Sequence, residues 1–549
     1  MPVLERLDAE ATTVQLTCGE AIIRLLENYG VDTLFGIPGF HTLALYRGIG
    51  QSGMRHILPR NEQGGGFMAD GYARSTGRPG VCTIISGPGV TNVSTALGQA
   101  YADSVPILLI TSTNASHTLG KGWGCLHETA DQNGLTKPIT AFSKTAMSPA
   151  EIPELIAQAF TLFASGRPRP VHISIPIDVL EAPATGRWQV CKLPGRPIVA
   201  RRSIAEAAEL LARAKRPVII VGGGAVEAGP DVAKLAEWLD ASVIATNAGK
   251  GVVPDSHTLS LGGGLIRQAV RDHLAESDVI LALGTELAAT DSFVEYLPIN
   301  GRLIRVDIDP AKFNDAYPAN LCLLGDAGEA ATGLLAAVKE KTGKPLSRGG
   351  HESVAKVRRK VIEDLGPVER QHKAVWDRLR EVLPPEAVIM GDITQIVYTG
   401  SAVMPVELPR RWFYPAGFGT LGCALPDAIG AKIAQPDTPV VAVAGDGGFM
   451  FTVQELITAA ELRMALPVII WNNEGYGMIR AGYDLNNIPR VADSPLTPDF
   501  ARLAEGFRCH YAAPETAEAF MASVRAALTA NAPTLIIVNQ DSRWVCNEK

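Results

Sequence analysis

Two short polar turns carry oxygen atoms that could bind one small divalent cation. Asp446 lies in a Gly-Asp-Gly-Gly turn, and Asn473 lies in an Asn-Asn-Glu-Gly turn. Each turn follows an apolar run that predicts a buried strand, at residues 440–444 and 467–471. Open α/β sheets bind ligands at the carboxyl ends of parallel strands, and Mg²⁺ prefers oxygen ligands that it shares with phosphates. We therefore expect Asp446, Asn473 and the carbonyl of Gly475 to hold Mg²⁺ beside a diphosphate.

The glycines of the first turn suit the same diphosphate. Gly447 and Gly448 let backbone N–H groups approach a phosphate closely, and the amino end of a helix favours its negative charge. Thr452 and Glu455 have the spacing of a capping box, which predicts a helix from there through Leu462. Either turn alone is as well explained by an ordinary loop. Their positions after adjacent strands favour the metal site.

Length and composition bound the class of protein. The chain has 549 residues, enough for about three domains. With 46% hydrophobic and 19% charged residues, it can bury large cores. The net charge of −7 gives no reason to expect nucleic acid or a membrane as a partner. The first residues lack a secretory apolar core and the eight cysteines form no CxxC pair, so we expect cytoplasmic localisation.

Apolar runs alternate with helical patterns along the whole chain. This repetition predicts the α/β class, with three doubly wound, mostly parallel-sheet domains at 1–185, 195–340 and 370–549. A basic, polar linker is expected from Lys339 to about Glu369. Strands are expected at 33–36, 81–86, 105–111, 217–221, 279–283, 388–390, 440–444, 468–471 and 534–538, with others within 165–180 and 302–310.

The stretch from Val440 to Met478 resembles the thiamin diphosphate signature of the pyruvate decarboxylase and acetolactate synthase superfamily. The resemblance covers nearly the whole chain and implies, in order, a pyrimidine-binding, a middle and a diphosphate-binding domain. It implies thiamin diphosphate and Mg²⁺ as cofactors, with the metal on Asp446, Asn473 and Gly475. Gly445 belongs to the same motif, and Gly448 departs from it because family members usually carry Ser there.

Glu62 resembles the glutamate that activates the cofactor in this superfamily. It stands in Arg-Asn-Glu-Gln-Gly-Gly-Gly at 60–66, with Ser-Gly-Pro-Gly-Val-Thr-Asn downstream at 86–92. A carboxyl group hydrogen-bonded to ring N1′ lets the 4′-nitrogen take the proton from thiazolium C2. If buried, that carboxyl group is expected to have a raised pKa. By residue type alone, Glu62 is as well explained as a surface residue that starts a helix.

Other positions match the motif residue by residue. The resemblance implies that the Gly419 carbonyl accepts a hydrogen bond from the 4′-amino group and that Leu421 wedges between the cofactor rings. It assigns diphosphate contacts to Thr394 and Gln395. In this superfamily the glutamate and the metal site belong to different subunits. The resemblance therefore implies a homo-oligomer, a dimer or a dimer of dimers, with active sites at the subunit interface.

Two loop histidines are candidates for proton transfer. His117 lies in a loop similar to the one that carries adjacent histidines in pyruvate-type decarboxylases, and Ser116 replaces the first of them. His127 matches a position that is polar in acetolactate synthases. A histidine with a near-neutral pKa could return a proton during decarboxylation. Both residues are equally consistent with ordinary loop histidines.

Two departures narrow the implied reaction. Ile479 and Phe40 stand where pyruvate decarboxylases carry Glu and Asp, which places the chain nearer acetolactate synthases and bacterial 2-oxo acid decarboxylases. Residues 122–128 are most similar to decarboxylases of 5-guanidino-2-oxopentanoate (2-ketoarginine). The implied function is decarboxylation of a small 2-oxo acid to an aldehyde. The alternative is an acetolactate synthase-like carboligase, which joins two carbonyl compounds.

Three further questions concern the carboxylate partner of a cationic substrate, the presence of FAD and whether the protein is catalytic. A cationic guanidinium tail requires a carboxylate partner, and the candidates are Glu128, Asp131, Glu474 and Asp484. Some relatives carry FAD on the middle domain, but Gly222–Gly224 is a weak nucleotide signal and 284–292 lacks the acetolactate synthase charge pattern, so we expect no FAD. A noncatalytic binding protein is disfavoured because binding alone does not require Glu62.

Overall fold

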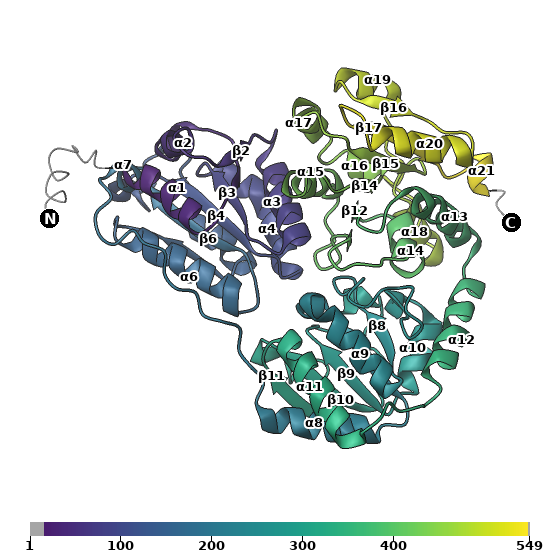
Figure 1. Ribbon diagram of the computed structural model, residues 1–549. Coiled ribbons are helices and arrows are strands. Elements are labelled where there is room, and N and C mark those ends of the chain that lie inside the picture. The colour runs from purple at the N-terminus through teal and green to yellow at the C-terminus, as the bar shows by residue number, and fades with distance from the viewer. Residues whose placement is uncertain (1–15, 547–549) are drawn as a thin grey trace, which may run out of the picture.

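The computed structural model describes residues 16–546 and contains three parallel β-sheets, each flanked by helices. Figure 1 shows the amino-terminal domain on the left, the carboxyl-terminal domain at the upper right and the middle domain below them. The sheets are fully parallel wherever strands pair, as the alternation of apolar runs and helices predicts. Within the described residues, no helix combines the length and the apolarity that crossing a membrane requires.

The amino-terminal sheet has six strands in the order β2-β1-β3-β4-β6-β5. The strands are β1 (Thr33–Phe35), β2 (Arg55–Ile57), β3 (Gly80–Ile84), β4 (Ile107–Thr113), β5 (Phe142–Thr145) and β6 (Val171–Pro176). The helices are α1 (Cys18–Asn28), α2 (Leu43–Ile49), α3 (Glu62–Thr76), α4 (Pro88–Ala102), α5 (Gln132–Thr136), α6 (Glu151–Ser165) and α7 (Ile177–Glu181). β3, β4 and β6 are buried along their whole lengths, as their apolar runs require.

The middle sheet has five strands in the order β11-β10-β9-β7-β8. They are β7 (Pro217–Val221), β8 (Ser242–Ala245), β9 (Val279–Leu283), β10 (Arg302–Asp307) and β11 (Leu321–Leu324). The helices are α8 (Arg201–Arg213), α9 (Gly229–Leu239), α10 (Gln268–Ala275), α11 (Ala327–Thr342) and α12 (Gly350–Glu363). The expectation of a linker from Lys339 was wrong in one respect. α12 forms inside it because Val354 and Val361 pack into the middle-domain core.

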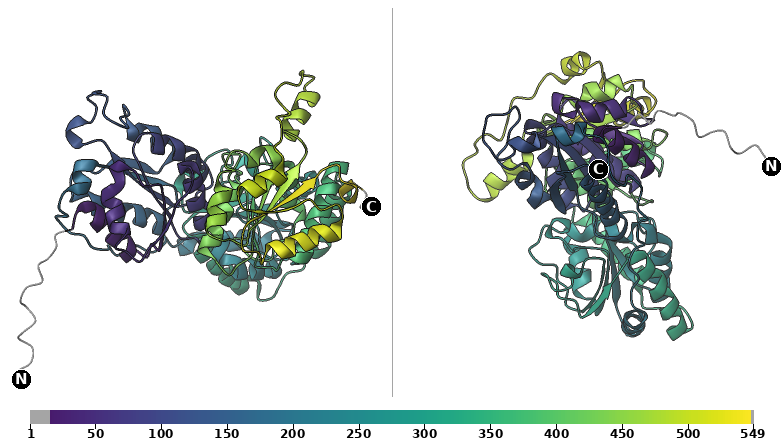
Figure 2. Two further views of the ribbon diagram at one scale, coloured as in Figure 1. Left: turned by 90° about the horizontal axis from the view of Figure 1, so that it is seen from above. Right: turned by 90° about the vertical axis from the view of Figure 1, so that its left-hand side faces the viewer.

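The carboxyl-terminal sheet has six strands in the order β13-β12-β14-β15-β17-β16. They are β12 (Val388–Gly391), β13 (Trp412–Phe413), β14 (Val440–Gly445), β15 (Pro467–Asn472), β16 (His510–Ala512) and β17 (Thr534–Asn539). The helices are α13 (Pro367–Val382), α14 (Gln395–Val403), α15 (Ala424–Ala434), α16 (Asp446–Phe449), α17 (Glu455–Glu461), α18 (Gly477–Leu485), α19 (Phe500–Gly506), α20 (Ala517–Ala527) and α21 (Arg543–Cys546). The segment that contains α18 projects from this domain (Figure 2).

The predicted capping box at Thr452 was wrong. The predicted helix is present as α17, but it begins at Glu455 without a cap on Thr452, and the short helix α16 precedes it. The Thr452 hydroxyl donates to the Gly422 carbonyl instead, at 2.5 Å. The Glu455 carboxylate accepts hydrogen bonds from the amino end of α3 in the other domain. The Thr452 and Glu455 side chains therefore both bond to residues that are distant in sequence, and neither forms the predicted capping box.

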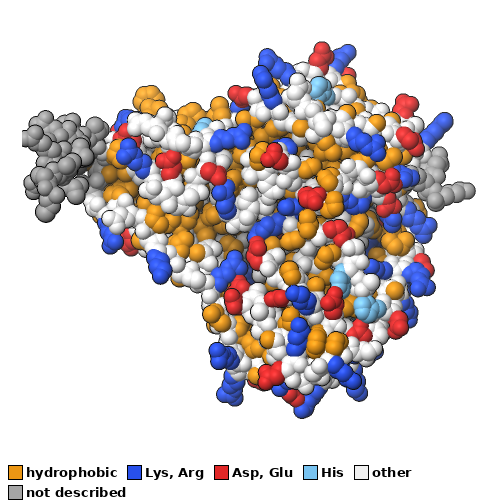
Figure 3. Space-filling view, in the orientation of Figure 1, with side chains coloured by type: hydrophobic (Ala, Val, Ile, Leu, Met, Phe, Trp, Pro, Cys, Tyr) orange, Lys and Arg blue, Asp and Glu red, His pale blue; other side chains and the backbone are white. Residues whose placement is uncertain are grey.

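Helices α3 and α15 join the amino-terminal and carboxyl-terminal domains into one core. At the crossing, a glycine of each helix lies against the backbone of the other helix. A Cβ at Gly71 would lie 2.0 Å from the Asp427 carbonyl, and one at Gly430 would lie 1.9 Å from the Met68 carbonyl. Only glycine fits at either point. On the face in Figure 3, Lys and Arg are interspersed with Asp and Glu, and no broad patch of one sign appears.

Candidate active site

The metal-binding residues predicted in the carboxyl-terminal domain lie together at the ends of β14 and β15. These strands pair in parallel, which brings the turn after Gly445 beside the turn after Asn472. The backbone N–H of Gly475 donates to Asp446 Oδ2 at 2.8 Å. The Asn473 amide donates to Gln395 Oε1 at 3.2 Å, which adds the start of α14 to the same group. A Cβ at Gly445 would lie 3.0 Å from Thr394 Oγ1.

The environment of Asp446 fits a bound cation. Its side chain is 1% exposed, and in the part of the chain that the structure describes it forms no ion pair. Burial raises the pKa of Asp446, although hydrogen bonds from the backbone N–H groups of Gly475, Gly447 and Asn473 oppose the rise. A buried carboxylate without a positive partner is costly, and a divalent metal ion would remove that cost.

No group of three His, Cys, Asp or Glu side chains that could hold a metal occurs among the described residues. The expected ligand set does not require one. It combines one carboxylate, one amide oxygen and one backbone carbonyl, which are the hard oxygen donors that Mg²⁺ accepts when phosphates complete its shell.

Asp392 is a site residue that the sequence reasoning missed. It follows β12, is 1% exposed and accepts the N–H of Gly422 at 2.8 Å through Oδ2 and at 3.1 Å through Oδ1. Burial raises its pKa to about 6. The hydrogen bonds from the Gly422 N–H to Asp392 fix the loop that carries Gly419 and Leu421. A Cβ at Gly448 would lie 3.3 Å from Leu421 Cδ2, so the expected ring wedge sits directly over the metal turn. An acid after a buried apolar strand, the same signal as at Asp446, could have identified Asp392.

Glu62 lies in the amino-terminal domain, in the first turn of α3. Asn61 caps this helix by accepting the N–H of Gln63 at 2.8 Å. Glu62 Oε2 accepts from the Asn92 amide at 2.9 Å, and the side chain is half-buried in the single chain. Within the described residues, no hydrogen bond links Glu62 to Asp446 or Asn473. Glu62 and the predicted metal ligands therefore lie in different domains and share no hydrogen bond in the described part of the chain.

The three glycines after Glu62 permit close packing, as expected. A Cβ at Gly64 would lie 2.4 Å from Glu455 Oε1, and one at Gly66 would lie 2.6 Å from the Ala96 methyl group. The Glu455 carboxylate accepts the backbone N–H of Arg60 at 3.0 Å and of Asn61 at 3.1 Å. The carboxyl-terminal domain thus holds the helix end that positions Glu62.

The two candidate histidines have different surroundings. His117 is exposed, in a loop that Asp178 anchors by accepting from the N–H of Ser116 at 2.8 Å. His127 is half-buried and packs edge-to-face on His41, with ring centroids 5.2 Å apart. The structure therefore places His127, and not His117, beside a second titratable ring. His41 was missed because only the fold brings the loop after β1 next to residue 127.

The four candidate carboxylates for a cationic substrate are not equally free. Glu128 accepts three backbone N–H groups of its own loop, from Gly122, Gly124 and Cys125. Asp131 caps α5 through the N–H of Gly134. Asp484 forms an ion pair with Arg490. Glu474 is exposed and lies beside the metal turn.

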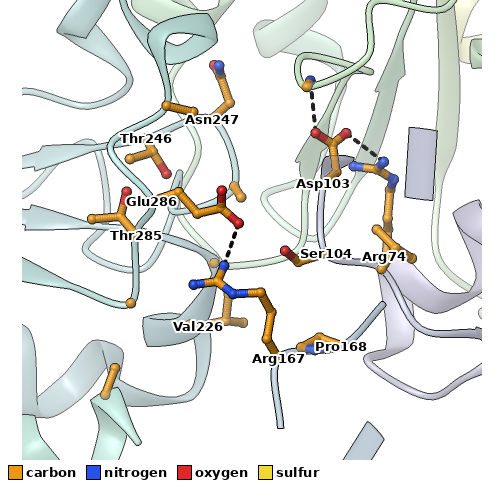
Figure 4. Close-up of a pocket in the computed structure, with 18 of the residues that line it drawn as sticks. Arg74, Asp103, Ser104, Arg167, Pro168, Val226, Thr246, Asn247, Thr285 and Glu286 are labelled. Carbon is orange, nitrogen blue, oxygen red and sulfur yellow. Dashed lines mark hydrogen bonds and ion pairs between the residues drawn. The ribbon is translucent and has the colours of Figure 1, made fainter. Parts of the chain in front are cut away.

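A cavity of about 300 Å³ lies where the three domains meet. Glycine loops after β7 and β9 form one wall, and Arg167 of the amino-terminal domain reaches across to Glu286 at 2.6 Å and Asp307 at 2.8 Å (Figure 4). The lining carries carboxylates and guanidinium groups in nearly equal number. They are Asp103, Glu286, Asp291, Asp307 and Asp326, and Arg74, Arg167, Arg196 and Arg410.

Comparison with known proteins agrees with this geometry. Three family models match: the thiamine pyrophosphate (thiamin diphosphate) enzyme N-terminal TPP binding domain at residues 16–135, the central domain at 204–334 and the C-terminal TPP binding domain at 392–538. The chain is 49% identical over 524 residues to the probable 2-ketoarginine decarboxylase AruI of Pseudomonas aeruginosa, which covers 95% of this chain and 93% of the relative.

Acetolactate synthases are more distant relatives. The enzyme of Mycobacterium bovis is 37% identical over 517 residues, covering 90% of this chain and 83% of its own. The isozyme 1 large subunit of Escherichia coli is 33% identical over 511 residues, covering 90% and 89%. The matched segments occur in the expected order and each lies within one of the three domains, so the chain belongs to the thiamine pyrophosphate enzyme family.

Proposed function

We propose that this protein converts a 2-oxo acid to an aldehyde and carbon dioxide, with thiamin diphosphate and Mg²⁺ as cofactors. The buried Asp446 carboxylate, which has no positive partner among residues 16–546, carries the proposal. The relative at 49% identity, which is named a probable 2-ketoarginine decarboxylase, supports it. Thiamin diphosphate would supply the electron sink that makes loss of carbon dioxide possible.

Different residues of this chain would bind the metal, bind the diphosphate and position the two cofactor rings. Asp446, Asn473 and the Gly475 carbonyl would hold the metal, while Thr394, Gln395 and the N–H groups near Gly447 and Gly448 would bind the diphosphate. Glu62 would hold a proton at ring N1′, and the Gly419 carbonyl would orient the 4′-amino group. Leu421, fixed through the loop that Asp392 binds, would set the angle between the two rings.

We propose 5-guanidino-2-oxopentanoate as the substrate, on the strength of the same relative. A 2-oxo acid panel with added thiamin diphosphate and Mg²⁺ tests this, with carbon dioxide, aldehyde and ligated products measured separately. The uncharged 5-ureido-2-oxopentanoate is a matched control, because it keeps the length and planarity of the tail. We expect the guanidino compound to be preferred over the ureido compound and over pyruvate. Equal or better turnover of pyruvate would contradict the substrate and leave the reaction class intact.

A carboligase is the second candidate function. The acetolactate synthases at 33% and 37% identity favour it. It predicts that ligated products, rather than the free aldehyde, account for most of the carbon dioxide released in the same panel.

We propose that the working unit is at least a dimer, with Glu62 of one chain facing the metal turn of the other. The family resemblance supports this arrangement, and Glu62 and Asp446 lie in different domains of one chain. Co-expression of a Glu62→Gln chain with an Asp446→Ala chain provides a test. Each variant alone should be inactive. Random pairing should restore about a quarter of the activity, because half the dimers would then contain one intact site out of two. Sites formed within single chains would give no recovery.

We propose that the middle domain carries no FAD. The ion pairs of Arg167 with Glu286 and Asp307 span the cavity beside the glycine loops. Arg167 and Arg196, the cationic side chains that could pair with a dinucleotide diphosphate at that edge, are already bound to Glu286, Asp307 and Asp326. A flavin absorption spectrum in the purified protein would contradict this proposal.

A further inference from the structure

His41, which the predicted site does not include, pairs with His127, which it does. His41 lies in the short turn Phe40–Thr42, and its Nδ1 is 2.8 Å from Ser86 Oγ. Its ring meets the His127 ring at 89°, with centroids 5.2 Å apart. The Ser86 hydroxyl binds Nδ1 of His41, which leaves Nε2 without a hydrogen bond in the described part of the chain.

His127 is held in place by strong local constraints. Its φ is +61°, a conformation that costs a residue with a side chain about 1–3 kcal/mol and occurs preferentially at functional sites. The loop is fixed on both sides, because Asn114 donates to the Leu126 carbonyl at 2.7 Å and Glu128 accepts three backbone N–H groups. The loop also fits closely over Gly87, where a Cβ would lie 2.7 Å from the His127 carbonyl.

The histidine pair and Glu62 contact the two ends of one segment, residues 86–92. Ser86 binds His41, and Asn92 donates to Glu62 at 2.9 Å. The buried Gln132 fixes the middle of the arrangement by accepting the N–H of Gly87 at 3.0 Å. The segment therefore places the histidine pair on the same side of the domain as the carboxylate that would address the cofactor.

The surroundings of His41 affect its affinity for a proton. Burial lowers the pKa of His41, and the neighbouring His127 lowers it further. The two rings meet edge to face, so each imidazole lies beside the other. A protonated imidazole that is half-buried and close to solvent can act as the general acid that aldehyde formation requires.

We propose that His41, paired with His127, delivers the proton that converts the decarboxylated substrate to the aldehyde. The inference rests on the proposed decarboxylase function. The bond between the carbonyl carbon and the carboxylate breaks, carbon dioxide leaves, and the carbonyl carbon keeps the electron pair. That pair takes one proton from the histidine pair, which regains it from water, so one proton is consumed for each aldehyde formed.

A bypass experiment separates proton delivery from every earlier step. Two ferricyanide ions per turnover remove the electron pair that stays on the carbonyl carbon after carbon dioxide leaves, and to which the proton would otherwise bind. After water attack, the substrate then leaves as a carboxylic acid without needing that proton. The assay measures aldehyde and ferricyanide-dependent acid formation for the wild-type holoenzyme and for His41→Asn and His41→Gln. His56→Asn is the matched control, because His56 is also partly buried in this domain, 3.0 Å from the Tyr46 hydroxyl.

We expect both His41 variants to lose aldehyde formation by about 100-fold or more while ferricyanide-dependent acid formation stays within about twofold. The control should leave both rates unchanged. An equal loss of both rates would show a structural role and overturn the inference, and so would an unchanged aldehyde rate. If the wild-type protein releases no carbon dioxide from any 2-oxo acid, the proposed function fails first and this assignment falls with it.

Discussion

The contact between Glu455 and the amino end of α3 predicts a large effect far from the cofactor. Glu455 is fully buried and accepts the N–H groups of Arg60 and Asn61 across the domain boundary. In Glu455→Ala, those two N–H groups lose their acceptor. Each unsatisfied donor costs about 1–3 kcal/mol, so we expect a loss of about 3 kcal/mol from the joined domains. Because α3 begins at Glu62, half-saturation with thiamin diphosphate should also shift to higher concentration.

The assay is differential scanning calorimetry of the apoprotein, followed by cofactor titration. A loss of 3 kcal/mol corresponds to a fall in melting temperature of about 6–12 °C for units of 150–250 residues. Glu461→Ala is the control, since Glu461 also pairs with Arg60 but its side chain is 59% exposed. Such a pair contributes about 1 kcal/mol or less. Equal shifts in the two variants would refute the role assigned to the buried carboxylate.

A second substitution sharpens the same test. Gly64→Ala would place a methyl carbon 2.4 Å from Glu455 Oε1 and should destabilise the protein alone. In the Glu455→Ala background the obstructing oxygen is gone, so the methyl group should be tolerated. We expect a coupling of about 0.5–3 kcal/mol between the two substitutions. Strict additivity would show that the two residues do not meet as described.

Three further predictions follow from the sites described. Glu62→Gln should lower kcat by about 10²- to 10⁴-fold while cofactor binding is retained, which activity assays and cofactor titration measure separately. Asp446→Ala, or treatment of the wild-type protein with EDTA, should abolish retention of thiamin diphosphate on gel filtration, and added Mg²⁺ should restore it only in the wild type. Burial lowers the pKa of His172 to about 3. The unfolded chain therefore takes up this proton first as the pH falls below 6.5, and stability should fall by about 1.4 kcal/mol per pH unit until pH 3. His172→Gln should remove this part of the acid sensitivity in melting curves recorded from pH 7 to 5.

Continuous apolar runs made most of the fold predictable. β7 at Pro217–Val221 and β9 at Val279–Leu283 occur at the predicted residues, because a strand buried on both faces must be apolar throughout. Strands such as β2, whose residues are Arg55, His56 and Ile57, carry no such signal. They exist because a neighbouring strand supplies their backbone hydrogen bonds, which single-chain patterns do not show.

The candidate site was predictable where it depends on local turns. Asp446 and Asn473 follow adjacent strands, and strand order alone brings them together. Glu62 came from family resemblance, since its neighbours in the fold are distant in sequence. The Thr452 cap failed and the His41 pairing was missed for the same reason: in each case the partner is chosen by tertiary packing. Contacts of this kind leave no periodic pattern in the nearby sequence from which they could be predicted.

The crossing of α3 and α15 constrains how this chain can change over generations. At codons 71 and 430, every amino acid replacement adds at least a Cβ, which would enter a space about 2 Å from a carbonyl oxygen. Selection should therefore remove variants at both codons as strictly as at a reacting residue, although neither touches the cofactor. Invariance of these two glycines among descendants would result from the close packing of α3 and α15. A ranking of positions by conservation alone would wrongly assign both glycines a catalytic role.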